Sequence, residues 1–176
     1  MGKLKMRKFT IIFALFIIAL SASITFGQTA KSSDKETLIK ATQILEAQPL
    51  QDKAKDFRGW AMRYIIETDD VSILVCSQML SSIMDKKNKY DDELLAQYTM
   101  GMAAFKLTNP NNAKDDNSAQ LAGMESMLRA YENILKEKPK AKFQALDDLI
   151  SKRDKGELKN FVEAAKCGEG KTEPIK

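Results

Sequence analysis

The rarity of residues that interrupt helices limits the fold of this chain more than any other feature. Only 8 glycines and 4 prolines occur among 176 residues, while Leu, Ala, Lys, Glu and Met, which favour helices, are abundant. Apolar residues recur at three- and four-residue spacing, and no convincing stretch alternates apolar and polar residues as a half-buried strand would. The sequence therefore predicts an all-α fold of about six to seven helices in antiparallel hairpins.

Turn and capping residues divide this pattern into seven expected helices. Ser33 and Glu36 have the spacing of a capping box, and Asp154 and Glu157 repeat it. The segment 71–84 is apolar around most of a helical circumference, so we expect a helix buried at the centre of the fold, with Asp69 or Asp70 as its cap. The expected helices cover residues 33–48, 51–67, 71–84, 91–107, 118–138, 142–152 and 154–166.

The first 27 residues have the pattern of a bacterial-type secretory signal peptide. Four basic residues precede the apolar run 9–20, and small residues lead up to Gly27. We expect cleavage after Gly27, which leaves a single all-helical domain over 28–167 and a flexible tail over 168–176. The protein would then be periplasmic or extracellular. If the apolar segment were kept, it would instead anchor the chain in the inner membrane.

The positive charge of the chain belongs to this N-terminal segment. The whole sequence has 28 Lys and Arg against 24 Asp and Glu, and the first 27 residues contribute four basic residues and no acid. The remaining 149 residues are therefore formally neutral. Net charge gives no support to nucleic-acid binding or to attraction by an anionic membrane.

Two cysteines, Cys76 and Cys167, remain after the expected cleavage. An even count in an oxidising compartment permits a disulfide between them. Such a bond would connect the C-terminal helix to the expected central helix. The alternative is a small buried apolar side chain at Cys76 and a mobile thiol at Cys167.

The residue types that commonly carry catalysis are missing or isolated. The chain has no histidine, which excludes serine–histidine and cysteine–histidine nucleophile arrangements. No phosphate-binding glycine loop, calcium loop or C-x-x-C redox motif occurs. Four Asp-Asp pairs, at 69–70, 91–92, 115–116 and 147–148, are better explained by helix starts and loops. We expect no enzymatic activity, no cofactor and no resident metal.

Two further patterns leave alternatives open. Methionines are frequent and could bind Cu(I), although filling a helical core is their commoner role. Lysines cluster in the run KEKPKAK, residues 136–142. This cluster could engage an anionic partner or could simply be a solvated helix end, where cations suit the helix dipole.

One segment carries a family resemblance. The run LLAQYTMGMAAFKL, residues 94–107, has a glycine among small and aromatic residues, and AYENILKEKP, residues 130–139, ends on a proline. Together they resemble one tetratricopeptide repeat over about residues 93–139. The resemblance implies close helix packing at Gly101, with Tyr131 and Pro139 at their family positions.

The same segment departs from the repeat pattern at several positions. Gln97 stands where the family prefers tryptophan, and Ala104 where it prefers tyrosine. A repeat-type solenoid and an irregular helical bundle both remain open as arrangements of the helices.

These patterns favour an exported, non-enzymatic helical protein that binds a protein or peptide of the cell envelope. Four aromatic residues are candidate partner contacts wherever they protrude: Trp60, Tyr64, Tyr98 and Phe105. The alternative is a periplasmic carrier for a small ligand or copper, with an apolar pocket near Trp60, Met79 and Met102.

Overall fold

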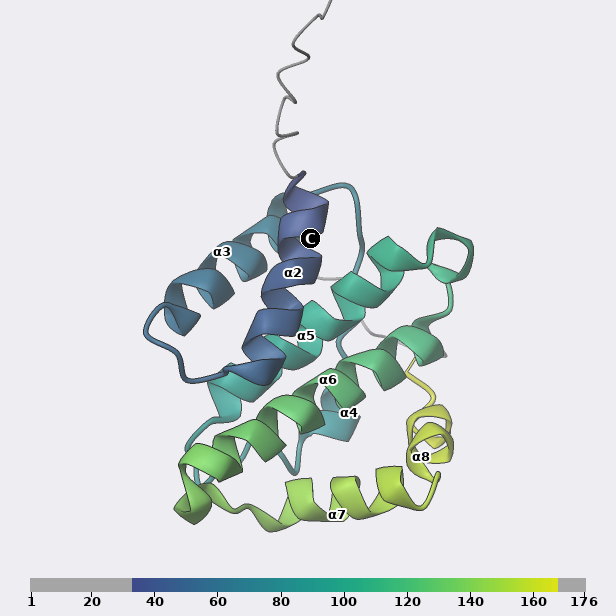
Figure 1. Ribbon diagram of the computed structural model, residues 1–176. Coiled ribbons are helices and arrows are strands. Elements are labelled where there is room, and N and C mark those ends of the chain that lie inside the picture. The colour runs from purple at the N-terminus through teal and green to yellow at the C-terminus, as the bar shows by residue number, and fades with distance from the viewer. Residues whose placement is uncertain (1–32, 168–176) are drawn as a thin grey trace, which may run out of the picture. The chain divides into compact units, whose positions relative to one another are not determined.

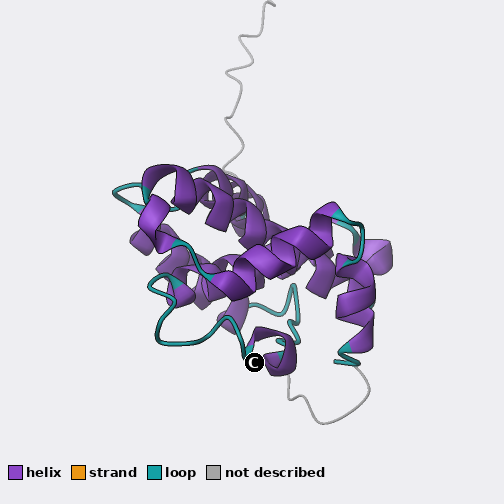
Figure 2. Ribbon diagram, turned by 90° about the horizontal axis from the view of Figure 1, so that it is seen from below, coloured by secondary structure: helices purple, strands orange, loops and turns teal. Residues whose placement is uncertain are grey.

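The computed structural model describes residues 33–167, and this part of the chain is helical. The all-α prediction is confirmed, because these residues contain seven α-helices and no strand (Figures 1 and 2). The expected signal peptide and C-terminal tail lie outside the described residues. The α-helices are α2 (Asp34–Ala47), α3 (Ala54–Glu67), α4 (Ser77–Leu80), α5 (Asp91–Thr108), α6 (Asp116–Glu137), α7 (Gln144–Asp154) and α8 (Leu158–Ala164).

Helices α5 and α6 form the central hairpin (Figure 1). Acids occupy the first turn of α5, and the side chain of Asp115 caps α6 by accepting a hydrogen bond from the Ser118 amide at 3.0 Å. The two helices touch where both carry glycine. A Cβ atom added at Gly101 would lie 2.6 Å from Ser126 Cβ, and one added at Gly123 would lie 2.7 Å from the Tyr98 carbonyl oxygen. The hairpin therefore depends on two side-chain-free positions for its close contact.

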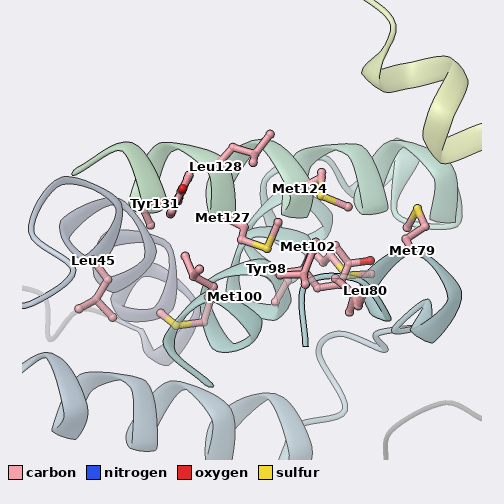
Figure 3. Packing of buried hydrophobic residues seen from close by; sticks show 14 of the residues in the cluster. Leu45, Met79, Leu80, Tyr98, Met100, Met102, Met124, Met127, Leu128 and Tyr131 are labelled. Atoms are coloured by element: carbon pink, nitrogen blue, oxygen red, sulfur yellow. The ribbon is translucent and has the colours of Figure 1, made fainter. Parts of the chain in front are cut away.

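The remaining helices pack around this hairpin. On one side, α2 contacts α3, α5 and α6, while α7 and α8 contact α6 and each other (Figure 1). Ser33 caps α2 as expected, since its hydroxyl accepts a hydrogen bond from the Glu36 amide at 3.3 Å. The buried core is rich in methionine. Met100, Met102, Met124 and Met127, from helices α5 and α6, are all fully buried (Figure 3).

The prediction of a central helix over residues 71–84 is wrong. Only Ser77–Leu80 is helical there, and residues 71–76 form an irregular segment in which Val71, Ile73 and Cys76 are buried. Side chains of the hairpin bind its carbonyl groups: Lys106 Nζ donates to Ser72 O at 2.9 Å, and Gln120 Nε2 donates to Leu74 O at 2.5 Å. These bonds replace the ones that a helix would supply internally. An apolar run buried on several sides is equally compatible with an extended segment.

The turn that precedes α8 also differs from the expectation. Asp154 and Glu157 do not form a capping box, because Asp154 is the last residue of α7 and Glu157 makes no side-chain cap. Gly156, with φ of 75°, ends α7 instead. The Glu157 amide donates to Lys152 O at 2.8 Å, and the Gly156 amide donates to Arg153 O at 2.9 Å. This left-handed glycine termination satisfies carbonyls that the end of α7 leaves free.

Candidate functional site

A groove runs between α2, α5 and α6, and we call it the hairpin groove. Its volume is about 380 Å³, within the range of small ligand sites. Small residues, Gly101, Ala104 and Ala122, leave space along it, and Phe105 supplies the one aromatic side chain. The lining residues are Ile39, Thr42, Gln43 and Glu46 from α2, Gly101, Ala104, Phe105 and Thr108 from α5, and Ala122, Glu125, Ser126 and Arg129 from α6.

A polar network at one end of the groove connects these three helices. The buried Gln97 amide donates to Thr42 O at 3.0 Å and to Ser126 Oγ at 2.9 Å. Ser126 in turn donates to Glu46 Oε1 at 2.6 Å. Arg129 donates two hydrogen bonds to the same carboxylate, from Nε to Oε2 at 2.7 Å and from Nη2 to Oε1 at 3.0 Å. Bidentate arginine–carboxylate pairs combine strength with defined geometry.

The network fixes the spacing of the groove walls. The hydrogen bond to Glu46 raises the pKa of the Arg129 guanidinium above its ordinary value, so Arg129 stays charged throughout the physiological range. Asn133 Nδ2 adds a bond from α6 to the Glu46 carbonyl oxygen at 2.6 Å. Every one of these groups holds α2 against α5 and α6. Ser126 accepts from Gln97 and donates to Glu46, so its hydroxyl joins all three helices.

The four aromatic residues expected to contact a partner lie in different places. Phe105 is half-buried and lines the hairpin groove. Trp60 and Tyr64 stack on α3, with ring centroids 5.7 Å apart and planes at 4°, and both are half-buried. Tyr98 is fully buried, and burial raises the pKa of its phenol well above the ordinary value. Tyr98 therefore belongs to the core, because no partner can reach it in this conformation.

Cys76 and Cys167 form a disulfide, with Cα atoms 5.6 Å apart and a sequence separation of 91. Both cysteines are buried. The bond connects the chain just after α8 to the irregular segment before α4, in place of the helix-to-helix connection expected from the sequence.

The residues proposed for the copper or ligand carrier are part of the packing. Met79 and Met102 are buried close to Tyr98 and Leu80 (Figure 3), and neither they nor Trp60 line the hairpin groove. Within residues 33–167, no group of three or more Cys, Asp or Glu side chains is arranged to hold a metal ion.

The Asp-Asp pairs have structural roles where the described residues show them. Asp91 and Asp92 open α5 and Asp115 caps α6. Asp70 lies outside any helix start. It binds Lys35 Nζ at 2.9 Å and accepts a hydrogen bond from the Tyr64 hydroxyl at 2.9 Å. These two bonds lower the pKa of the Asp70 carboxyl, with Lys35 the larger cause.

Sequence reasoning missed the polar network. Glu46, Ser126 and Arg129 form no motif, and they come together only because α2 packs across the hairpin. Gln97 carried the one usable signal, as a polar residue at the position where the repeat pattern prefers tryptophan. A buried amide needs hydrogen-bond partners from neighbouring elements, and this need predicts a network even when its members are unknown.

No helix within the described part of the chain combines the length and the hydropathy that crossing a bilayer requires. No family model, curated protein or solved structure matches the chain. The hairpin groove and the contacts around it are therefore the basis for assigning a function.

Proposed function

We propose that this protein is an exported, non-enzymatic helical module that binds a segment of a partner protein in the hairpin groove. The observation that carries the proposal is the groove itself, which has small residues along α5 and α6, one half-buried aromatic ring, and walls that a polar network holds at a fixed spacing. A site whose walls are already fixed loses little conformational freedom when a partner binds.

The lining indicates the chemistry of the partner segment. Ala104, Phe105 and Ala122 are half-buried and offer an apolar strip, while Gln43, Glu125 and Thr108 supply polar groups beside it. An amphipathic segment that inserts one or two apolar side chains against Phe105 matches this pattern, as in helix-in-groove recognition. The groove volume of about 380 Å³ suits a few side chains and excludes a whole folded domain from entering.

Two sequence features support the other parts of the proposal. The basic, apolar and small-residue pattern over residues 1–27 is typical of an export signal. The disulfide agrees with export, because disulfides form and persist in oxidising compartments. The resemblance of residues 93–139 to a tetratricopeptide repeat, a module that binds peptides, agrees with the close packing at Gly101.

Site-specific photocrosslinking tests the groove directly. A photoreactive amino acid replaces Ala122, which lines the groove, or Ala164, which is exposed on α8 outside it. We expect a discrete protein adduct at position 122 and none at 164. Loss of that adduct in Phe105→Ala, with retention in Phe57→Ala on α3, would assign the contact to the groove. Equal adducts at 122 and 164, or none at 122, would contradict the proposal.

Export has its own measurement. Mass spectrometry of the protein recovered from its source cells should give an N-terminus at or near Gln28, as cleavage after Gly27 requires. A chain that begins at Met1 and stays with the cytoplasmic fraction would refute export and leave the groove experiment unaffected.

A further inference from the structure

Two lysine-rich segments that are far apart in sequence surround one pocket. Lys87 and Lys89 come from the loop before α5, and Lys138, Lys140 and Lys142 come from the end of α6 and the turn after it. The pocket has a volume of about 420 Å³. Tyr90, Pro139 and Ala141 form its apolar wall, and Glu137 is its one acid. We call it the lysine pocket. The sequence showed the cluster at 136–142 and gave no sign that a second basic segment joins it.

The backbone holds both segments in place. Asn88 is 3% exposed and donates from Nδ2 to Ile83 O at 3.1 Å, while its Oδ1 accepts from the Tyr90 amide at 3.3 Å. On the other side, the Phe143 amide donates to the hydroxyl of buried Tyr131 at 2.8 Å. Hydrogen bonds of buried residues therefore fix the backbone of both lysine-bearing segments. The lysines come together because of this backbone arrangement.

Most of this positive charge is not neutralised within the described chain. Among residues 33–167, Lys142 pairs with Asp147 at 3.6 Å, and Lys89 lies over the Tyr90 ring at 5.7 Å from its centroid. The side chains of Lys87, Lys138 and Lys140 are exposed and form no ion pair with a described residue. Five cations around one hollow repel one another, and an anion that binds among them relieves that repulsion.

The geometry points to the lysine pocket as a binding site for a compact, multiply charged phosphate group. Lysine binds phosphate as a point charge, and a phosphate group with several negative charges attracts several lysines at once. Among the described residues, the arginines that make ion pairs, Arg58, Arg129 and Arg153, are directed to carboxylates of the protein itself. A pocket of this volume admits an oligophosphate or the headgroup of a phospholipid. The two sources share the same chemistry and are separated by experiment.

The test compares two triple variants with equal charge change. Lys87→Gln/Lys138→Gln/Lys140→Gln removes the unpaired lysines of the pocket. Lys40→Gln/Lys53→Gln/Lys55→Gln removes three exposed lysines of the α2–α3 region. Binding of sodium tripolyphosphate is measured by calorimetry at about 20 mM salt, where screening is weak. We expect the wild type and the α2–α3 variant to bind alike, and the pocket variant to bind at least about tenfold more weakly.

Vesicles separate the two sources. Cosedimentation with phosphatidylcholine vesicles that contain phosphatidic acid, whose phosphomonoester can carry two negative charges, would assign a lipid headgroup if the pocket variant loses it. Tripolyphosphate binding without vesicle binding would assign a soluble phosphate. Both results support the proposal.

Three results would overturn the proposal of a phosphate site. The first is that the wild type binds neither probe, and the second is that both variants weaken tripolyphosphate binding equally. The third is that poly-glutamate displaces tripolyphosphate at equal charge concentration. The last result would show that the pocket takes acidic peptides. Circular dichroism and urea unfolding confirm that each variant folds. The groove experiment is independent, so either proposal can fail alone.

Discussion

The close approach of α5 and α6 can be tested by adding a single methyl group at Gly123. Gly123→Ala places a Cβ atom 2.6 Å from Met102 Cγ and 2.7 Å from the Tyr98 carbonyl oxygen. The Met102 side chain can move aside, but the Tyr98 oxygen is backbone in the middle of α5. The substitution can be accommodated only if the two helices separate by several tenths of an ångström, which loosens contacts along their length.

The expected loss follows from two opposing effects. Alanine is about 1 kcal/mol more favourable than glycine inside a helix, and overpacking of a core costs about 1–3 kcal/mol. Since one clash is with backbone, the cost should lie near the upper end of that range. We expect Gly123→Ala to lower the free energy of unfolding by about 2 kcal/mol.

Gly59 provides the matched control. It lies inside α3, is exposed, and a Cβ atom there would meet nothing within 4 Å. Gly59→Ala should therefore raise the free energy of unfolding by about 0.5–1 kcal/mol through helix propensity alone. The assay is urea unfolding with the disulfide intact, followed by far-ultraviolet circular dichroism and by the fluorescence of the single tryptophan, Trp60.

The two substitutions should change the free energy of unfolding in opposite directions. If Gly123→Ala stabilised the protein as much as Gly59→Ala does, the close approach of α5 and α6 would be refuted. A change in the denaturant dependence, with an unchanged midpoint, would indicate instead a change in the compactness of the unfolded or native state, or a loss of two-state unfolding.

Two further predictions concern the disulfide and alkaline pH. Replacing both Cys76 and Cys167 by serine should lower the free energy of unfolding by on the order of 4 kcal/mol, as the chain-entropy model gives for so long a loop; identical urea midpoints with and without reductant would contradict this. Burial raises the pKa of Tyr131 from 10.0 to about 12. The unfolded chain therefore releases this proton first, so the contribution of Tyr131 is complete below pH 10 and is lost as pH rises to about 12. The stability difference between wild type and Tyr131→Phe should shrink across that window, and a constant difference would count against the shift.

Local signals were sufficient for most of the helices. Ser33 at the start of α2, the acids at the start of α5 and the few prolines and glycines between elements all act within a few residues. Periodicity and capping therefore located these elements. The segment 71–76 shows where this reasoning stops. Its conformation is fixed by Lys106 and Gln120 from distant helices, and local propensity contains no information about such bonds.

The functional surfaces were harder to predict for the same reason. The hairpin groove requires α2 to lie against both helices of the hairpin, and the lysine pocket requires residues near 88 to meet residues near 140. Both are products of packing between segments. The sequence offered single members of each, Phe105 for the groove and the lysines at 136–142 for the pocket, without the partners that complete them.

The disulfide also changes how the protein responds to cleavage. Because Cys76 is joined to Cys167, the chain from α4 through α8 is a closed covalent ring, and α2 and α3 form an open arm attached to it. A single cut in the exposed connection between α5 and α6 opens the ring without releasing any piece. In a compartment with active proteases, a molecule nicked there keeps its full mass and both halves of its central hairpin until a reductant reaches the buried bond.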